Sequence, residues 1–138
     1  MANDSEEQWR YDRGGTDSTR RKHLWKKDEA GFQEFGGEIV GKCPCSLSES
    51  PDLLVTLLND AVSSDKVRGG SPVRLFTVHD GVVYIARQTV PGVSYHGYPW
   101  SSSNGQRLDP DVRQALEEKA KEKGCLESYQ EWMKSYGG

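Results

Sequence analysis

Two histidines and two arginines are the side chains of this sequence best suited to chemistry on an anionic group. His96 lies between two tyrosines in a loop-like segment, and His79 precedes an Asp-Gly pair. A histidine titrates near neutral pH and can therefore act as a general acid or base. Arg74 and Arg87 carry the forked donors that match phosphate and carboxylate oxygens. Together these residues predict either an anion-binding surface or a proton-transfer site.

The three cysteines are the other reactive side chains, and their number and spacing do not favour a metal site. Cys43 and Cys45 are separated by one residue, whereas zinc ligands are usually two to four residues apart and four are needed. Cys125, His79 or His96 would have to complete the set. Three cysteines also make no disulfide framework. We therefore expect reduced thiols, no bound metal and, because no phosphate loop or dinucleotide fingerprint is present, no cofactor.

Length and composition indicate one modest domain. The chain has 138 residues, 34% of them apolar, and a formal net charge of −3. Its mean hydropathy is −0.78. No segment approaches the roughly 20 apolar residues that a membrane span requires, and the first residues lack the pattern of a signal peptide. We expect a soluble cytoplasmic protein, of bacterial type, that makes no membrane contact.

Residues 1–29 have the composition of a flexible tail, which leaves 30–138 as a single domain. This segment contains seven basic and seven acidic residues and almost no aliphatic side chains, so it cannot bury enough apolar surface to fold alone. Its one distinctive feature is a basic cluster around Trp25 that is a candidate contact for nucleic acid or an acidic partner. The cluster consists of Arg20, Arg21, Lys22, Lys26 and Lys27.

The order of the expected elements predicts an α+β fold with a small, mostly antiparallel sheet. Residues 32–40 read as one strand interrupted by a glycine pair, and residues 41–49 read as a turn. A helix with Ser50 as its N-cap follows, and then comes a β-hairpin. Residues 90–107 read as a long loop. Two C-terminal helices end the chain, the first closed by Gly124 and the second covering about 126–136.

The hairpin turn at Asp80-Gly81 sets the strand register. A two-residue turn pairs His79 with Val82, and counting outwards places Arg74 directly opposite Arg87. Like charges in this position repel each other, so a balancing anion is expected. Either Glu38, on the adjacent expected strand, lies between the guanidinium groups, or the site binds an external phosphate or carboxylate.

The aromatic segment between Pro91 and Ser101 leads to the preferred functional interpretation. Tyr95, Tyr98 and Trp100 are typical interface anchors, and at least one of them is expected to be exposed if the segment binds a partner. If all three are buried, the segment is instead a structural plug over the sheet. The sequence therefore favours a small protein-interaction module, of the toxin-neutralising or adaptor kind. Its expected binding residues are Arg74, Arg87, Tyr95, His96, Tyr98 and Trp100.

The alternative is a metal-independent, RNase-like toxin domain. Such an enzyme needs two proton-transfer groups and a cation that holds the scissile phosphate. His96 and His79 would supply the two proton-transfer groups, and Arg87 or Arg74 would supply the cation. The acidic composition of the domain weighs against this interpretation, because nucleic-acid enzymes usually present a basic surface.

Overall fold

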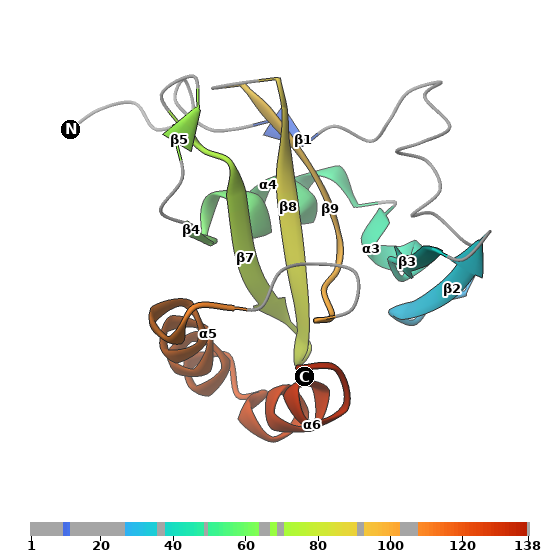
Figure 1. The fold of residues 1–138 in the computed structure, drawn as a ribbon, viewed down its shortest axis with the longest axis vertical. Helices are drawn as coiled ribbons and strands as arrows, with labels where there is room; N and C mark the ends of the chain where they lie inside the picture. The colour runs from blue at the N-terminus through green and yellow to red at the C-terminus, as the bar shows by residue number, and fades with distance from the viewer. Residues whose placement is uncertain are drawn as a thin grey trace.

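A β-hairpin forms the centre of the fold (Figure 1). It consists of β7 (Arg74–His79) and β8 (Val82–Val90). Asp80 and Gly81 both have positive φ, 51° and 81°, as a two-residue hairpin turn of mirror-image type requires. The register is the expected one, with His79 opposite Val82 and Arg74 opposite Arg87. The computed structural model describes residues 10–11, 27–35, 38–48, 50–63, 67–68, 71–90, 93–102 and 108–137.

Three further strands extend the hairpin into a five-stranded sheet of order β1-β9-β8-β7-β4. Strand β9 (Ser94–Pro99) pairs antiparallel with β8, and the short β4 (Val62–Ser63) pairs antiparallel with β7. At the far edge, β1 (Arg10–Tyr11) runs parallel to β9. The expected mostly antiparallel α+β architecture is confirmed.

The prediction of a long loop over 90–107 was wrong, since β9 occupies its first half. The chain reverses between Val90 and Val93, whose N–H donates to the Val90 carbonyl at 2.9 Å. All six residues of β9 are buried. A strand covered on both faces lacks the alternation of polar and apolar residues that marks a strand in sequence.

The single interrupted strand expected over 32–40 is instead a second hairpin. Strands β2 (Gly31–Phe35) and β3 (Glu38–Lys42) pair antiparallel in a separate sheet, with Phe35 opposite Glu38. The glycine pair itself lies outside the described residues. A third small sheet pairs β5 (Val67–Arg68) with β6 (Ser71–Pro72).

Four described helices complete the fold, and the three longer ones begin and end close to the expected positions. Ser50 occupies the N-cap position of α4, but its hydroxyl donates to the Ser46 carbonyl at 2.7 Å instead of capping the helix. At the end of α5, Gly124 has φ 73° and the N–H of Cys125 donates to the carbonyl of Ala120, as in a Schellman motif. The helices are α3 (Cys45–Ser48), α4 (Pro51–Asn59), α5 (Pro110–Glu122) and α6 (Leu126–Tyr136).

The helices pack at two places on the main sheet. Helix α4 lies behind the sheet, while α5 and α6 gather at the turn end of the β7–β8 hairpin (Figure 1). There the ammonium group of Lys123 donates to the Val78 carbonyl at 2.6 Å, and the indole N–H of Trp132 donates to the Trp100 carbonyl at 3.0 Å. At the opposite end of the hairpin, α4 packs on the face that carries Leu75 and Ala86.

Most of the expected flexible tail, residues 1–29, lies outside the described residues, as does the basic cluster except for the exposed Lys27. The described residues of this segment are Arg10 and Tyr11, which form β1, and residues 27–29, which adjoin the expected boundary at 30. The Lys27 carbonyl accepts from the N–H of Cys45, and the Asp28 carboxylate accepts from the N–H of Ser46 at 3.0 Å. Hydrogen bonding from the Ser46 side chain, together with that from its N–H, lowers the pKa of Asp28. No described helix has the length and apolarity to cross a membrane.

Candidate functional site

A cross-strand row of basic side chains lies on the main sheet at the end away from α5 and α6. Arg74 is paired with Arg87, and Arg87 is in turn paired with His96 of β9. Directly opposed residues of neighbouring strands project to the same face, so the three side chains form one row. Arg87 is exposed, Arg74 half-buried and His96 buried. The structure therefore brings together three of the residues that the sequence singled out.

The surroundings of this row differ from those expected. Glu38 belongs to β3, in a separate sheet, and the strands next to the hairpin are β4 and β9. The expectation that Glu38 lies on an adjacent strand was therefore wrong. Among the described residues, none forms an ion pair with Arg87.

His79 does not join His96. It lies at the turn end of the hairpin, five residue pairs from the Arg74–Arg87 row, which corresponds to about 17 Å along the strands. The alternation along β7 and β8 also places His79 on the other face of the sheet from Arg74 and Arg87. Its imidazole lies 3.5 Å from the exposed carboxylate of Asp80. The two histidines therefore do not form the paired acid and base of the RNase-like alternative.

The three aromatic residues of segment 95–100 are buried, as the structural-plug alternative requires, so the expectation of an exposed binding surface in this segment was wrong. Tyr95 and Trp100 are 0% exposed and Tyr98 is 9% exposed. Tyr95 packs with Leu58 and Leu75, and its hydroxyl donates to the Pro72 carbonyl. These side chains hold β9 in the core and are not accessible to a partner.

Cys43 is a core residue. It is buried, and its thiol lies 3.7 Å from the carbonyl oxygen of Gly97, to which it donates. Burial raises the pKa of this thiol to about 12, which opposes formation of the thiolate that a soft metal needs. Among the described residues, no group of three or more His, Cys, Asp or Glu side chains is placed to hold a metal ion.

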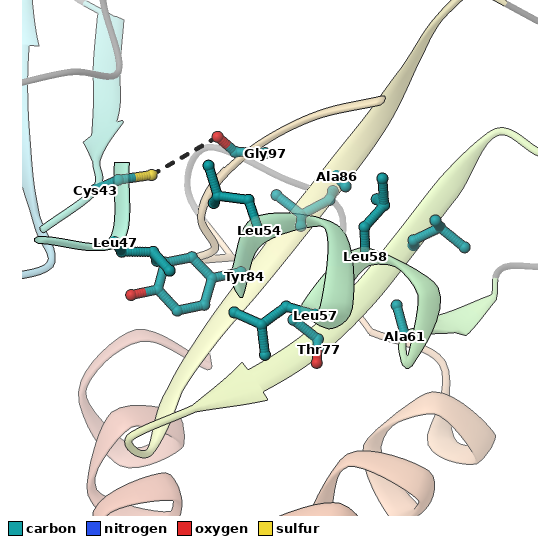
Figure 2. Close-up of a pocket in the computed structure, with 12 residues that line it drawn as sticks. Cys43, Leu47, Leu54, Leu57, Leu58, Ala61, Thr77, Tyr84, Ala86 and Gly97 are labelled. Carbon is teal, nitrogen blue, oxygen red and sulfur yellow. Dashed lines mark hydrogen bonds between the residues drawn. The ribbon is translucent and has the colours of Figure 1, made fainter. Parts of the chain in front are cut away.

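An apolar cavity of about 40 Å³ lies between α4 and the sheet. Figure 2 shows leucines of α4 packed over Tyr84 and Ala86, with Cys43 reaching Gly97 at one side. The hydroxyl of Thr77, which also lines this cavity, is buried and makes no hydrogen bond within the described part of the chain. A cavity of this size holds at most a very small apolar molecule, so we interpret it as a packing defect of the core.

A larger open groove of about 550 Å³ lies beside the hairpin turn. Its floor contains Leu47 and Val82, and its rim carries the carboxylates of Asp28, Glu29 and Asp80. Among the described residues that line it, none is a lysine or arginine. The groove is therefore negatively charged around an apolar floor.

An aromatic cluster of Phe32, Trp132 and Tyr136 joins β2 to α6. The ring centroids of Trp132 and Tyr136 are 4.3 Å apart, and the Phe32 ring lies 4.9 Å from that of Tyr136. Tyr136 is 37% exposed, and the other two are half-buried. No local pattern in the sequence predicts this cluster, because about 100 residues separate Phe32 from Trp132.

Comparison with protein-family models, curated proteins and solved structures finds no match to this chain.

Proposed function

We propose that the chain is a small protein-interaction module that binds its partner through the aromatic cluster of Phe32, Trp132 and Tyr136. The partial exposure of this cluster is the observation that carries the proposal. Tyrosine and tryptophan are enriched among the residues that dominate binding energy. The indole N–H of Trp132 is hydrogen-bonded to the Trp100 carbonyl, which fixes the ring before binding and lowers the entropic cost of association.

The acidic groove indicates the charge of the partner. Asp28 and Glu29 on its rim precede Phe32 by four and three residues, so the acidic rim and the aromatic cluster share one short segment. A partner that places an apolar side chain on the cluster and a basic side chain near the rim is complementary to both. The toxin-neutralising or adaptor role expected from the sequence is compatible with such a basic partner and is part of this proposal.

The proposal is tested by replacing the exposed ring. We expect Tyr136→Ala to weaken partner binding by about 2 kcal/mol. The partner is captured from a lysate of the source cell on the immobilised chain, identified, purified and titrated by calorimetry. The matched control is Val93→Ala, which truncates a side chain of 44% exposure outside the cluster and should leave binding unchanged.

Two results would contradict the proposal. One is equal affinity of the wild type and Tyr136→Ala for the purified partner. The other is concentration-dependent dimerisation of the wild type in sedimentation, abolished by Tyr136→Ala, because the cluster would then join copies of this chain. Circular dichroism of each variant shows whether the fold is retained.

The RNase-like alternative keeps one supporting observation, the position of His96 beside Arg87. It lacks a second proton-transfer group, since His79 lies elsewhere. Expression of the chain without a partner distinguishes the two functions. Normal growth is expected for an interaction module, whereas growth inhibition that His96→Ala abolishes would establish the enzyme.

A further inference from the structure

The polar end of the main sheet contains more hydrogen-bonding groups than the basic row alone. Ser94 lies two residues before His96 in β9, so both side chains project to the same face. The Ser94 hydroxyl lies 2.7 Å from that of Thr89, and either of the two can donate. On the other side of the row, Phe76, Ile85 and Tyr98 are paired across the same three strands and are buried. The face thus changes from apolar core to a cationic, hydroxyl-bearing end within one pair of residues.

We propose that Arg87, with Arg74, His96 and Ser94 beside it, forms a binding site for the dianionic phosphate group of a monoester or of inorganic phosphate. Two opposed guanidinium groups place two permanent positive charges on one row. A carboxylate neutralises one of them, whereas a phosphate carries a charge of about −1.5 to −2 and three acceptor oxygens. A phosphate bound at this row places its charge beside both guanidinium groups, which the register brings together.

The geometry favours a single phosphate group over a nucleic-acid strand. The row spans three strands in the direction perpendicular to them, which is about 10 Å at the usual strand spacing. The next residues on the same face towards the turn are buried and apolar, so the row does not continue as a basic track. The formal net charge of −3 also opposes binding of a polyanion.

This site is distinct from the surface of the proposed function. The aromatic cluster lies on α6 and β2, whereas the basic row lies at the end of the hairpin away from α6. Either proposal can therefore fail while the other holds.

The test is a titration of the full chain with inorganic phosphate at constant ionic strength, followed by amide chemical shifts. We expect saturable shifts at Arg74, Arg87 and His96 in the wild type. Arg87→Gln should weaken binding at least about tenfold, in line with the usual contribution of a hydrogen bond to a charged group. The matched control, Arg113→Gln, changes an exposed arginine of α5 and should bind as the wild type does. Because Arg87 is exposed, its replacement is expected to leave the fold intact, which an unchanged amide spectrum outside the site would show.

Further ligands identify the source of the phosphate. Tighter binding of a blocked phosphoserine than of inorganic phosphate assigns the site to a phosphorylated side chain, and equal binding assigns it to free phosphate. Acetate that binds as tightly as phosphate would overturn the proposal in favour of a carboxylate site. Much tighter, steeply salt-dependent binding of a short oligouridylate would overturn it in favour of RNA. If the shifts do not saturate with phosphate, or if Arg113→Gln loses as much phosphate affinity as Arg87→Gln, no defined site exists.

Discussion

At the scale of single residues, two glycines with positive φ differ in their surroundings. A Cβ atom on Gly124 would meet nothing within 4 Å, whereas one on Gly81 would lie 2.2 Å from the Cβ of Ser128. Gly124→Ala should therefore lower the free energy of unfolding by only about 1–2 kcal/mol, the cost of a left-handed backbone conformation for alanine. Gly81→Ala should lower the free energy of unfolding clearly more, because the hairpin turn must also move away from α6. Urea unfolding of both variants measures the difference.

A double-variant cycle separates the two contributions at Gly81. Adding Ser128→Gly removes the atom nearest to the new methyl group, so it should restore part of the stability lost in Gly81→Ala. Equal unfolding free energies for Gly81→Ala and Gly124→Ala would mean that the contact between the turn and α6 is not tight.

The buried thiol of Cys43 gives a prediction about alkaline stability. Its pKa rises from 9.0 to about 12 on burial, so the folded state keeps a proton that the unfolded state releases. The stabilisation that this provides is complete below pH 9 and is lost as the pH rises from 9 towards 12. The free energy of unfolding should fall by up to about 1.4 kcal/mol per pH unit in this window. Since lysines and tyrosines titrate in the same range, the measured quantity is the difference from Cys43→Ala, which should show a shallower decline. Identical slopes in the two proteins would contradict the prediction.

At the scale of elements, the helices and strands best predicted from the sequence are those whose own residues mark where they begin and end. The Asp80-Gly81 turn fixes the β7–β8 register, and Pro110 and Gly124 mark the limits of α5. These signals act through backbone conformations that only certain residues adopt easily, so they are readable without knowledge of the tertiary structure.

Elements defined by their neighbours could not be predicted in the same way. Strand β9 is buried between β8 and other parts of the chain, and its aromatic residues resemble those of a loop that binds a partner.

The candidate sites likewise depend partly on local signals and partly on tertiary packing. The opposition of Arg74 and Arg87 follows from the turn, but the addition of His96 requires the pairing of β9. The aromatic cluster requires the packing of β2 against α6, for which no local signal exists.

At the scale of the whole molecule, the β2–β3 hairpin is a separate two-stranded sheet attached to a larger body. A two-stranded hairpin is marginally stable alone, so its order depends on its attachments. One is the burial of Val40, which is 2% exposed, and another is the packing of the Phe32 ring against α6. The surface of the proposed function thus lies where a small sheet meets the main body.

Removing one attachment should loosen the hairpin without unfolding the molecule. Phe32→Ala eliminates two ring contacts, each of about 0.5–1.5 kcal/mol, so amide exchange in β2 and β3 should accelerate by roughly tenfold or more. Exchange in β7 and β8 should change little, because those strands are held by α4, α5 and α6. Mass-spectrometric hydrogen exchange resolves the two regions, with Val93→Ala as the control for a truncated side chain outside the interface. Equal acceleration in β2 and β8 would show that the hairpin and the main sheet unfold as one unit. Selective acceleration in β2 and β3 would show that the Phe32 ring attaches the hairpin to α6. In the wild type, the purified partner bound to Phe32, Trp132 and Tyr136 should then slow exchange in β2.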